Sequence, residues 1–208
     1  MVAIEALKEC TKSVLTCAKS GLTPASSGAP SSVAAAWFPS HFVRRRPLTP
    51  NVKCHMDTSR MIPADRIQNR EVAEYAAEAA QFLASHHWCR SVVSTHLAWA
   101  VAGVLGVFLC RLVPARAEVD DTLWVVVGDL PPAYLVCDDA SDWREALDAY
   151  IYEMEQWVVA VRSGSSLDDV IPVKVDPTVE HADMLDSRLA FIRTRIIADD
   201  AEDIESDT

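Results

Sequence analysis

The sequence lacks the short motifs that most often mark nucleotide binding or hydrolysis. None of the patterns GxxxxGK[ST], GxGxxG, HExxH or GxSxG occurs in its 208 residues. Such patterns supply a phosphate-binding loop, a pair of zinc-ligating histidines or a nucleophilic serine at the spacing that the chemistry requires. Nucleotide cofactors and the common hydrolase mechanisms are therefore unsupported, although an enzyme is not excluded.

Long hydrophobic runs are also missing. The longest, residues 97–110, has fourteen residues and ends at Arg111. A helix needs about 20 apolar residues to cross a bilayer, and the valines and glycines of this run favour buried strands. The N-terminus shows no secretory h-region with a cleavage site. The sequence therefore predicts a soluble, cytoplasmic protein that does not engage a membrane.

The six cysteines form no CxxC pair, the spacing typical of zinc ribbons and redox motifs. Cys110 and Cys137 lie inside apolar runs, where a cysteine behaves as a small hydrophobic residue. In a cytosol we expect reduced thiols.

Acidic residues are absent between Glu9 and Asp57, a stretch rich in serine, alanine and proline. Residues 1–60 carry eight Lys/Arg and three Asp/Glu, a net charge of +5. Because the stretch has no sustained apolar period, we expect a disordered basic extension, either translated from upstream of the true start or similar to a targeting peptide.

The rest of the chain is acidic. Residues 61–208 carry eleven Lys/Arg and 27 Asp/Glu, a net charge of −16. We expect one folded domain over residues 61–198 and a disordered acidic tail over 199–208. A domain of this charge repels the phosphates of nucleic acids and anionic lipids. The predicted partners are therefore a protein or a second copy of the chain, with no nucleic acid and no membrane.

Hydrophobic periodicity predicts three helices and a group of strands. The first helix is expected over 63–86, the second over 143–162 between an Asp142 cap and Gly164, and the third from Asp176-Pro177. The expected strands are residues 97–101 and 104–113 (two strands, or one bent strand), 123–127 and 133–137.

Short connections between these strands favour an antiparallel meander. The predicted fold class is α+β: a short antiparallel sheet of three to four strands packed by about three helices, in the order α-β-β-β-α-α. We expect the helices to cover one face of the sheet.

Several short motifs resemble a family of small bacterial proteins of unknown function. They are Leu97-Ala98-Trp99, Gly106-Val107-Phe108, and Trp124-Val125-Val126-Val127 leading into Gly-Asp-x-Pro-x-x-Tyr at residues 128–134. The family has a tryptophan-rich strand at this point, and two of its tryptophan positions are valine in this chain. Shorter matches follow at 143–147, 155–157 and 184–188. The resemblance implies one fold unit over roughly residues 90–197 and no particular activity.

A cluster of soft ligands follows the first predicted helix. His86, His87 and Cys89 lie within four residues, and His96 follows seven residues later. Zn²⁺ prefers imidazole and thiolate ligands in a tetrahedron, so His86, Cys89 and His96 are candidate zinc ligands. The alternative is a histidine stabilised at a helix C-terminus beside a packed Trp and Cys. Cys89 with His96 or His181 also satisfies the residue types of a nucleophilic pair.

The turn at residues 128–132 places Asp129 between two apolar strands. Such a carboxylate is able to act as a base, to bind a cation or to cap its own turn. Trp99 and Trp124 are expected to line an exposed sheet face, unless the first helix covers them. The predicted binding residues are therefore Trp99, Trp124, Asp129 and Tyr134.

The sequence thus favours a non-catalytic binding protein whose acidic surface pairs with a cationic protein, as small inhibitors and immunity proteins do. The alternatives are a small metalloprotein or hydrolase that uses the His/Cys cluster, and a structural homodimer.

Overall fold

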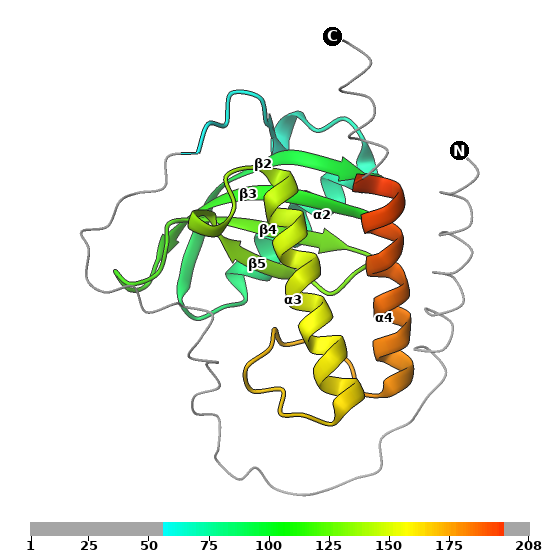
Figure 1. Ribbon diagram of the computed structural model, residues 1–208. Helices are drawn as coiled ribbons and strands as arrows, with labels where there is room; N and C mark the ends of the chain where they lie inside the picture. The colour runs from blue at the N-terminus through cyan, green and yellow to red at the C-terminus, as the bar shows by residue number, and fades with distance from the viewer. Residues whose placement is uncertain (1–55, 198–208) are drawn as a thin grey trace, which may run out of the picture. The chain divides into compact units, whose positions relative to one another are not determined.

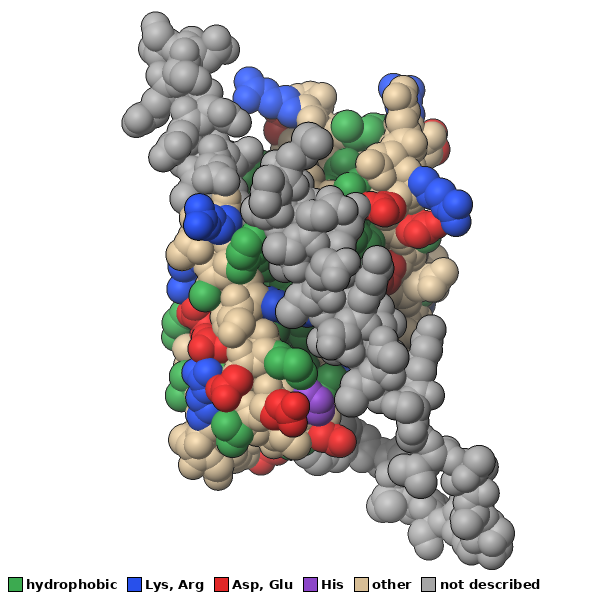
Figure 2. Space-filling model, turned by 90° about the vertical axis from the view of Figure 1, so that its right-hand side faces the viewer, with side chains coloured by type: hydrophobic (Ala, Val, Ile, Leu, Met, Phe, Trp, Pro, Cys, Tyr) green, Lys and Arg blue, Asp and Glu red, His purple; other side chains and the backbone are tan. Residues whose placement is uncertain are grey.

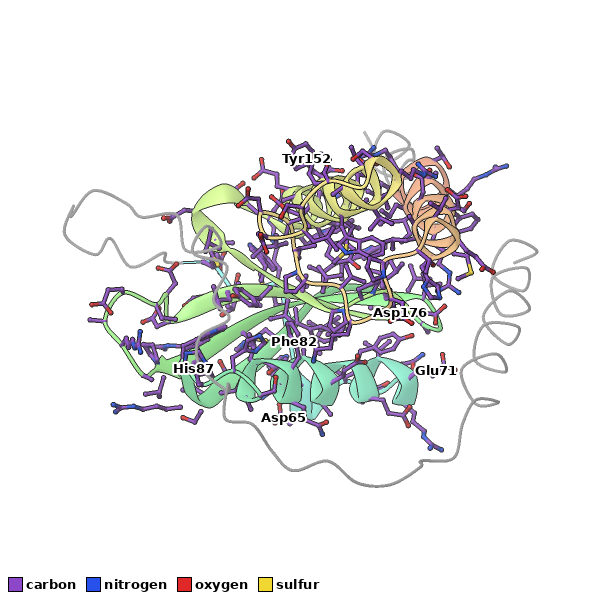
Figure 3. The ribbon with its side chains drawn as sticks, turned by 90° about the horizontal axis from the view of Figure 1, so that it is seen from below. Asp65, Glu71, Phe82, His87, Tyr152 and Asp176 are labelled. Atoms are coloured by element: carbon purple, nitrogen blue, oxygen red, sulfur yellow. The ribbon has the colours of Figure 1, made fainter. Side chains whose placement is uncertain are left out.

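The computed structural model describes residues 56–197, which all belong to one compact unit. The expectations for the basic extension up to residue 55 and for the acidic tail lie outside the described residues. Within them, one antiparallel sheet lies between two helical layers (Figures 1 and 3).

The sheet is a meander in which each strand pairs with its neighbours in the chain. The predicted α+β fold and antiparallel order are confirmed, with five strands in place of three to four. The strands are β1 (Ile62–Pro63), β2 (Cys89–Val101), β3 (Leu105–Pro114), β4 (Thr122–Gly128) and β5 (Ala133–Val136). The run of residues 97–113 forms two strands because Gly103 adopts a positive φ of 76° at the turn between them.

The expectation that the helices cover one sheet face was wrong. Helix α2 lies on one face, and α3 and α4 lie on the other (Figure 3). Strand β4 explains this arrangement, since its residues 123–127 are all apolar and are at most 2% exposed. Leu123 and Val125 pack into the α2 core, whereas Trp124 and Val126 point to the opposite face. A strand that is apolar on both faces requires a cover on each.

Helix α2 spans Arg70–Ala84 and begins seven residues later than predicted. Asn69 caps it by accepting hydrogen bonds from the amides of Glu71 and Val72. The preceding segment forms β1 and the short 3₁₀ turn η1 (Ala64–Arg66). Pro63 lacks a backbone donor, so it suits this two-residue edge strand better than a helix interior.

Helix α3 spans Trp143–Ser163 and confirms the predicted caps. Asp142 accepts hydrogen bonds from the amides of Arg144 and Glu145, and Gly164 ends the helix with a φ of 65°. Its inward face meets the sheet through fully buried residues such as Tyr150 and Met154.

Helix α4 spans Val179–Phe191 and continues into the π-helical turn η3 (Ile192–Ile197). Its cap is Thr178 and not the predicted Asp176, whose carbonyl instead accepts a bond from the His181 ring. Met184 of α4 is 36% exposed. No helix within residues 56–197 has the length and apolar character needed to cross a membrane.

Candidate functional site

The three candidate zinc ligands do not converge. Cys89 lies in the core beneath α2, where burial raises the pKa of its thiol. His96 pairs with Leu109 and follows Thr95, whose side chain faces the α2 core; it therefore lies on the opposite face of the sheet. Within residues 56–197, no group of three His, Cys, Asp or Glu side chains is placed to hold one metal ion.

His86 belongs instead to an aromatic cluster at the C-terminal end of α2. Its Nδ1 atom lies 2.8 Å from the carbonyl oxygen of Phe82, so Nδ1 carries the proton. The His86 ring lies 4.9 Å from the Trp88 ring and 5.4 Å from the Tyr134 ring, centroid to centroid. Burial lowers the pKa of His86, and hydrogen bonds to the backbone at Phe82 and Leu83 oppose that shift in part. A neutral imidazole is therefore part of the packing.

The predicted nucleophilic pair is not formed either. A cysteine nucleophile requires a lowered pKa and a neighbouring base, and the pKa of Cys89 is raised. His96 and His181 both lie on the far side of the sheet from Cys89, His181 near the start of α4.

Both tryptophans of the predicted aromatic face pack against other residues, Trp124 fully buried and Trp99 partly exposed. Trp124 is completely buried and donates a 3.0 Å hydrogen bond from Nε1 to the carbonyl of Ala140. The ring of Trp99 stacks on Trp143 of α3 with a centroid separation of 4.6 Å and an interplanar angle of 2°. The expectation of an exposed aromatic face was wrong, because α3 begins directly above these strands.

Asp129 lies in the β4–β5 turn and joins that turn to helix α4. The backbone amide of Asp129 donates to the carbonyl of Val104 (2.8 Å), while Nη1 of Arg188 reaches the Asp129 carbonyl at 2.7 Å and its carboxylate at 3.2 Å. Burial raises the pKa of Asp129, and Arg188 opposes that shift. The neighbouring Tyr150 hydroxyl donates to the carbonyl of Pro131. These contacts join the β4–β5 turn to α3 and α4.

A solvent-facing surface on α3, which the sequence reasoning missed, is the strongest binding candidate. We call it the α3 outer face and define it by Glu145, Asp148, Tyr152 and Val159. Tyr152 is 56% exposed and Val159 is 58% exposed. They are seven residues apart, so they lie on one side of the helix. Figure 3 shows Tyr152 pointing away from the sheet.

The charges of the α3 outer face are negative. Glu145 and Asp148 are exposed and precede Tyr152 on the same side of the helix. The Glu145 carboxylate accepts bonds from the amide and hydroxyl of Ser141, which lower its pKa and keep it ionised. A sequence signal existed: Tyr152 and Val159 are apolar residues that fall outside the main apolar stripe of this helix.

The acidity of the described residues is not uniform. They carry twelve Lys/Arg against 22 Asp/Glu, a net charge of −10. Figure 2 shows acidic and basic side chains interspersed with small apolar patches on the face seen there. For binding, the charge of each local surface therefore matters more than the net charge of the domain.

No protein-family model matches the chain, and no curated protein or solved structure is detectably similar to it. The family resemblance based on the short motifs therefore stays a prediction.

Proposed function

We propose that this protein is a non-catalytic binding protein that docks a cationic protein segment on the α3 outer face. The observation that carries the proposal is the exposed Tyr152, with Val159 two turns beyond it and two carboxylates before it. Tyrosine is enriched at binding hot spots because it buries a large apolar ring with few rotatable bonds.

The geometry of the α3 outer face suits an extended or helical basic segment. From Glu145 to Val159 the face runs about 21 Å along the helix axis, at 1.5 Å per residue. Glu145 and Asp148 provide charges for lysine or arginine at one end, and Tyr152 and Val159 provide apolar contact at the other. Neither Tyr152 nor Val159 contributes to the core, so their apolar surface is available without any cost to folding.

Titration of the full chain with a fluorescein-labelled arginine- and leucine-rich peptide tests the proposal. We expect binding that weakens steeply with added salt, because exposed charges are screened beyond about 8 Å at physiological ionic strength. Tyr152→Ala and Asp148→Asn should each weaken binding by about fivefold to tenfold.

Asp65→Asn is the matched control, because Asp65 is also exposed but lies on the α2 side of the sheet (Figure 3). It should leave the affinity unchanged. Salt-independent binding, or equal losses from Asp65→Asn and Asp148→Asn, would contradict the proposal. A chain that forms a dimer through Tyr152 instead would support the structural homodimer.

A further inference from the structure

The far end of the β2–β3 hairpin extends beyond the rest of the sheet. The last β3–β4 pair is Arg111 with Thr122, whereas the β2–β3 ladder continues to Cys89 and Pro114. Figure 1 places this end away from α4. Because β4 begins only at Thr122, it does not reach the hairpin end, which has a face that the α3 layer does not cover.

The exposed fractions of the side chains along one face of β3 show where the cover by the α3 layer ends. Val107, Leu109 and Val113 alternate on the side opposite α2. Val107 is 0% exposed, Leu109 is 3% exposed and Val113 is 41% exposed. Arg111, between the last two, is exposed and lies on the same face. The hairpin end thus presents an apolar side chain beside a guanidinium group.

Two β-bulges in β2 add a second exposed arginine and a second exposed valine to this end of the hairpin. The register shifts between Cys89 and Ser91 and again between Val92 and Ser94. The inserted residues are Arg90 and Val93; both are exposed, and Val93, at 60%, has the highest exposed fraction of the large apolar residues described. A bulge interrupts the hydrogen-bond ladder and redirects a side chain, and bulges concentrate next to functional sites.

Three arginines at this end form no ion pair with another described residue. Arg90, Arg111 and Arg116 form no ion pair within residues 56–197, although carboxylates outnumber basic side chains there. The amide of Ala115 donates to the carbonyl of Trp88, which places Arg116 beside the start of β2. Four other arginines pair with carboxylates: Arg70, Arg162, Arg188 and Arg193. These three arginines thus form no ion pair with the described carboxylates, although the connection from β3 to β4 also carries Glu118, Asp120 and Asp121.

We infer that this hairpin end binds an acidic peptide segment of a partner protein. Arg90, Arg111 and Arg116 pair with its carboxylates, and Val93 and Val113 contact apolar side chains between them. Arginine suits this role because its planar guanidinium forms bidentate bonds with a carboxylate. The two bulges make continuous strand addition along β2 unfavourable, so the peptide lies across the face and does not extend the sheet. This surface is separate from the α3 outer face and opposite to it in charge.

Fluorescence anisotropy of the full chain with a labelled glutamate- and leucine-rich decapeptide tests the inference. The double variant Arg90→Gln/Arg111→Gln should weaken binding by about tenfold, because it removes two of the three guanidinium groups that pair with the peptide's carboxylates. Val93→Ser should weaken it by a smaller factor without any change of charge. Arg60→Gln/Arg195→Gln, which removes two exposed arginines elsewhere, should leave the affinity unchanged.

Hydrogen exchange on the same complex locates the peptide. Protection should appear in residues 89–95 and 110–116, and Tyr152→Ala should not alter it, so that failure here is distinct from failure of the α3 proposal. The inference is overturned if the wild-type chain does not bind the peptide, if both double variants lose affinity equally, or if protection falls only in residues 1–60. Full displacement by inorganic polyphosphate, with Val93→Ser binding like wild type, would also overturn it in favour of a general anion surface.

Discussion

Arg188 holds the β4–β5 turn mainly through a backbone oxygen. Its Nη1 atom lies 2.7 Å from the carbonyl of Asp129 and 3.2 Å from the carboxylate of the same residue. The two residues are 59 positions apart, and the Arg188 side chain is only 19% exposed. Its Nη2 atom is buried without a hydrogen-bond partner among the described residues, so Nη1 makes both contacts to the turn.

The two partners of this contact should differ in their contribution to stability. Arg188→Ala should lower the free energy of unfolding by about 2 kcal/mol, because it removes a partly buried hydrogen bond to a charged group. Asp129→Ala should cost about 1 kcal/mol, because any residue there retains the carbonyl. Urea denaturation measures both. Arg162→Ala, in an exposed pair with Asp183, should cost less than about 1 kcal/mol; an equal cost for all three variants would contradict this account.

Gly128 should tolerate no side chain. Its φ is 136°, and a Cβ atom there would lie 2.5 Å from the carbonyl oxygen of Val104 and 2.7 Å from the Cα of Leu105. Gly128→Ala should therefore destabilise the fold by about 3 kcal/mol or more, measured as the loss of cooperative thermal unfolding.

Gly164 provides the matched control. Its φ is 65°, but a Cβ atom there meets nothing within 4 Å. Gly164→Ala should cost only about 1 kcal/mol, the penalty of the left-handed conformation. Similar losses at the two glycines would show that the backbone conformation, and not the contact with β3, determines the effect.

Acid should weaken the fold through His86. Because burial lowers the pKa of His86 in the folded state, the unfolded chain takes up a proton at a higher pH than the folded chain does. The stability contributed by neutral His86 is present above about pH 6.5, the ordinary histidine value, and is lost as the pH falls toward the lower folded-state pKa. Urea midpoints measured from pH 7.5 down to pH 5 should decline less in His86→Phe than in wild type. The control Val159→Ala, at an exposed position that does not titrate, should keep the wild-type decline.

The Trp99–Trp143 stack should be measurable as a coupling energy. A double-mutant cycle with Trp99→Ala and Trp143→Ala should give about 1 kcal/mol of coupling, the value typical of an aromatic pair. A cycle of Trp99→Ala with Val159→Ala, which is exposed on the outer side of α3, should give none. Zero coupling in the first cycle would mean that the stack contributes only through buried area.

The sequence predicted what local patterns determine. The cap at Asp142, the stop at Gly164 and the buried β4 all follow from residues within a few positions of one another. The two-sided cover of the sheet was missed, although the apolar run of β4 already required it. The separation of His96 from Cys89 depends on strand register, which two bulges shift and which spacing alone cannot reveal.

The two proposed binding surfaces were harder to predict, because each is defined by the absence of a covering element. Tyr152 and Val93 are ordinary residues in the sequence, and their exposure depends on where α3 and β4 lie. Trp124 illustrates the converse: a tryptophan on a strand suggested a binding face, but the tertiary fold buries it.

The meander also has a consequence for how quickly the chain folds. Every strand pairs with a sequence neighbour, so most of the sheet closes only short loops, and the entropy lost in bringing strands together is small. We expect the hairpin of β2 and β3 to form early, and the contact between Arg188 and the β4–β5 turn, which joins distant residues, to form after it. Substitutions at Arg188 should therefore accelerate unfolding and leave the refolding rate nearly unchanged.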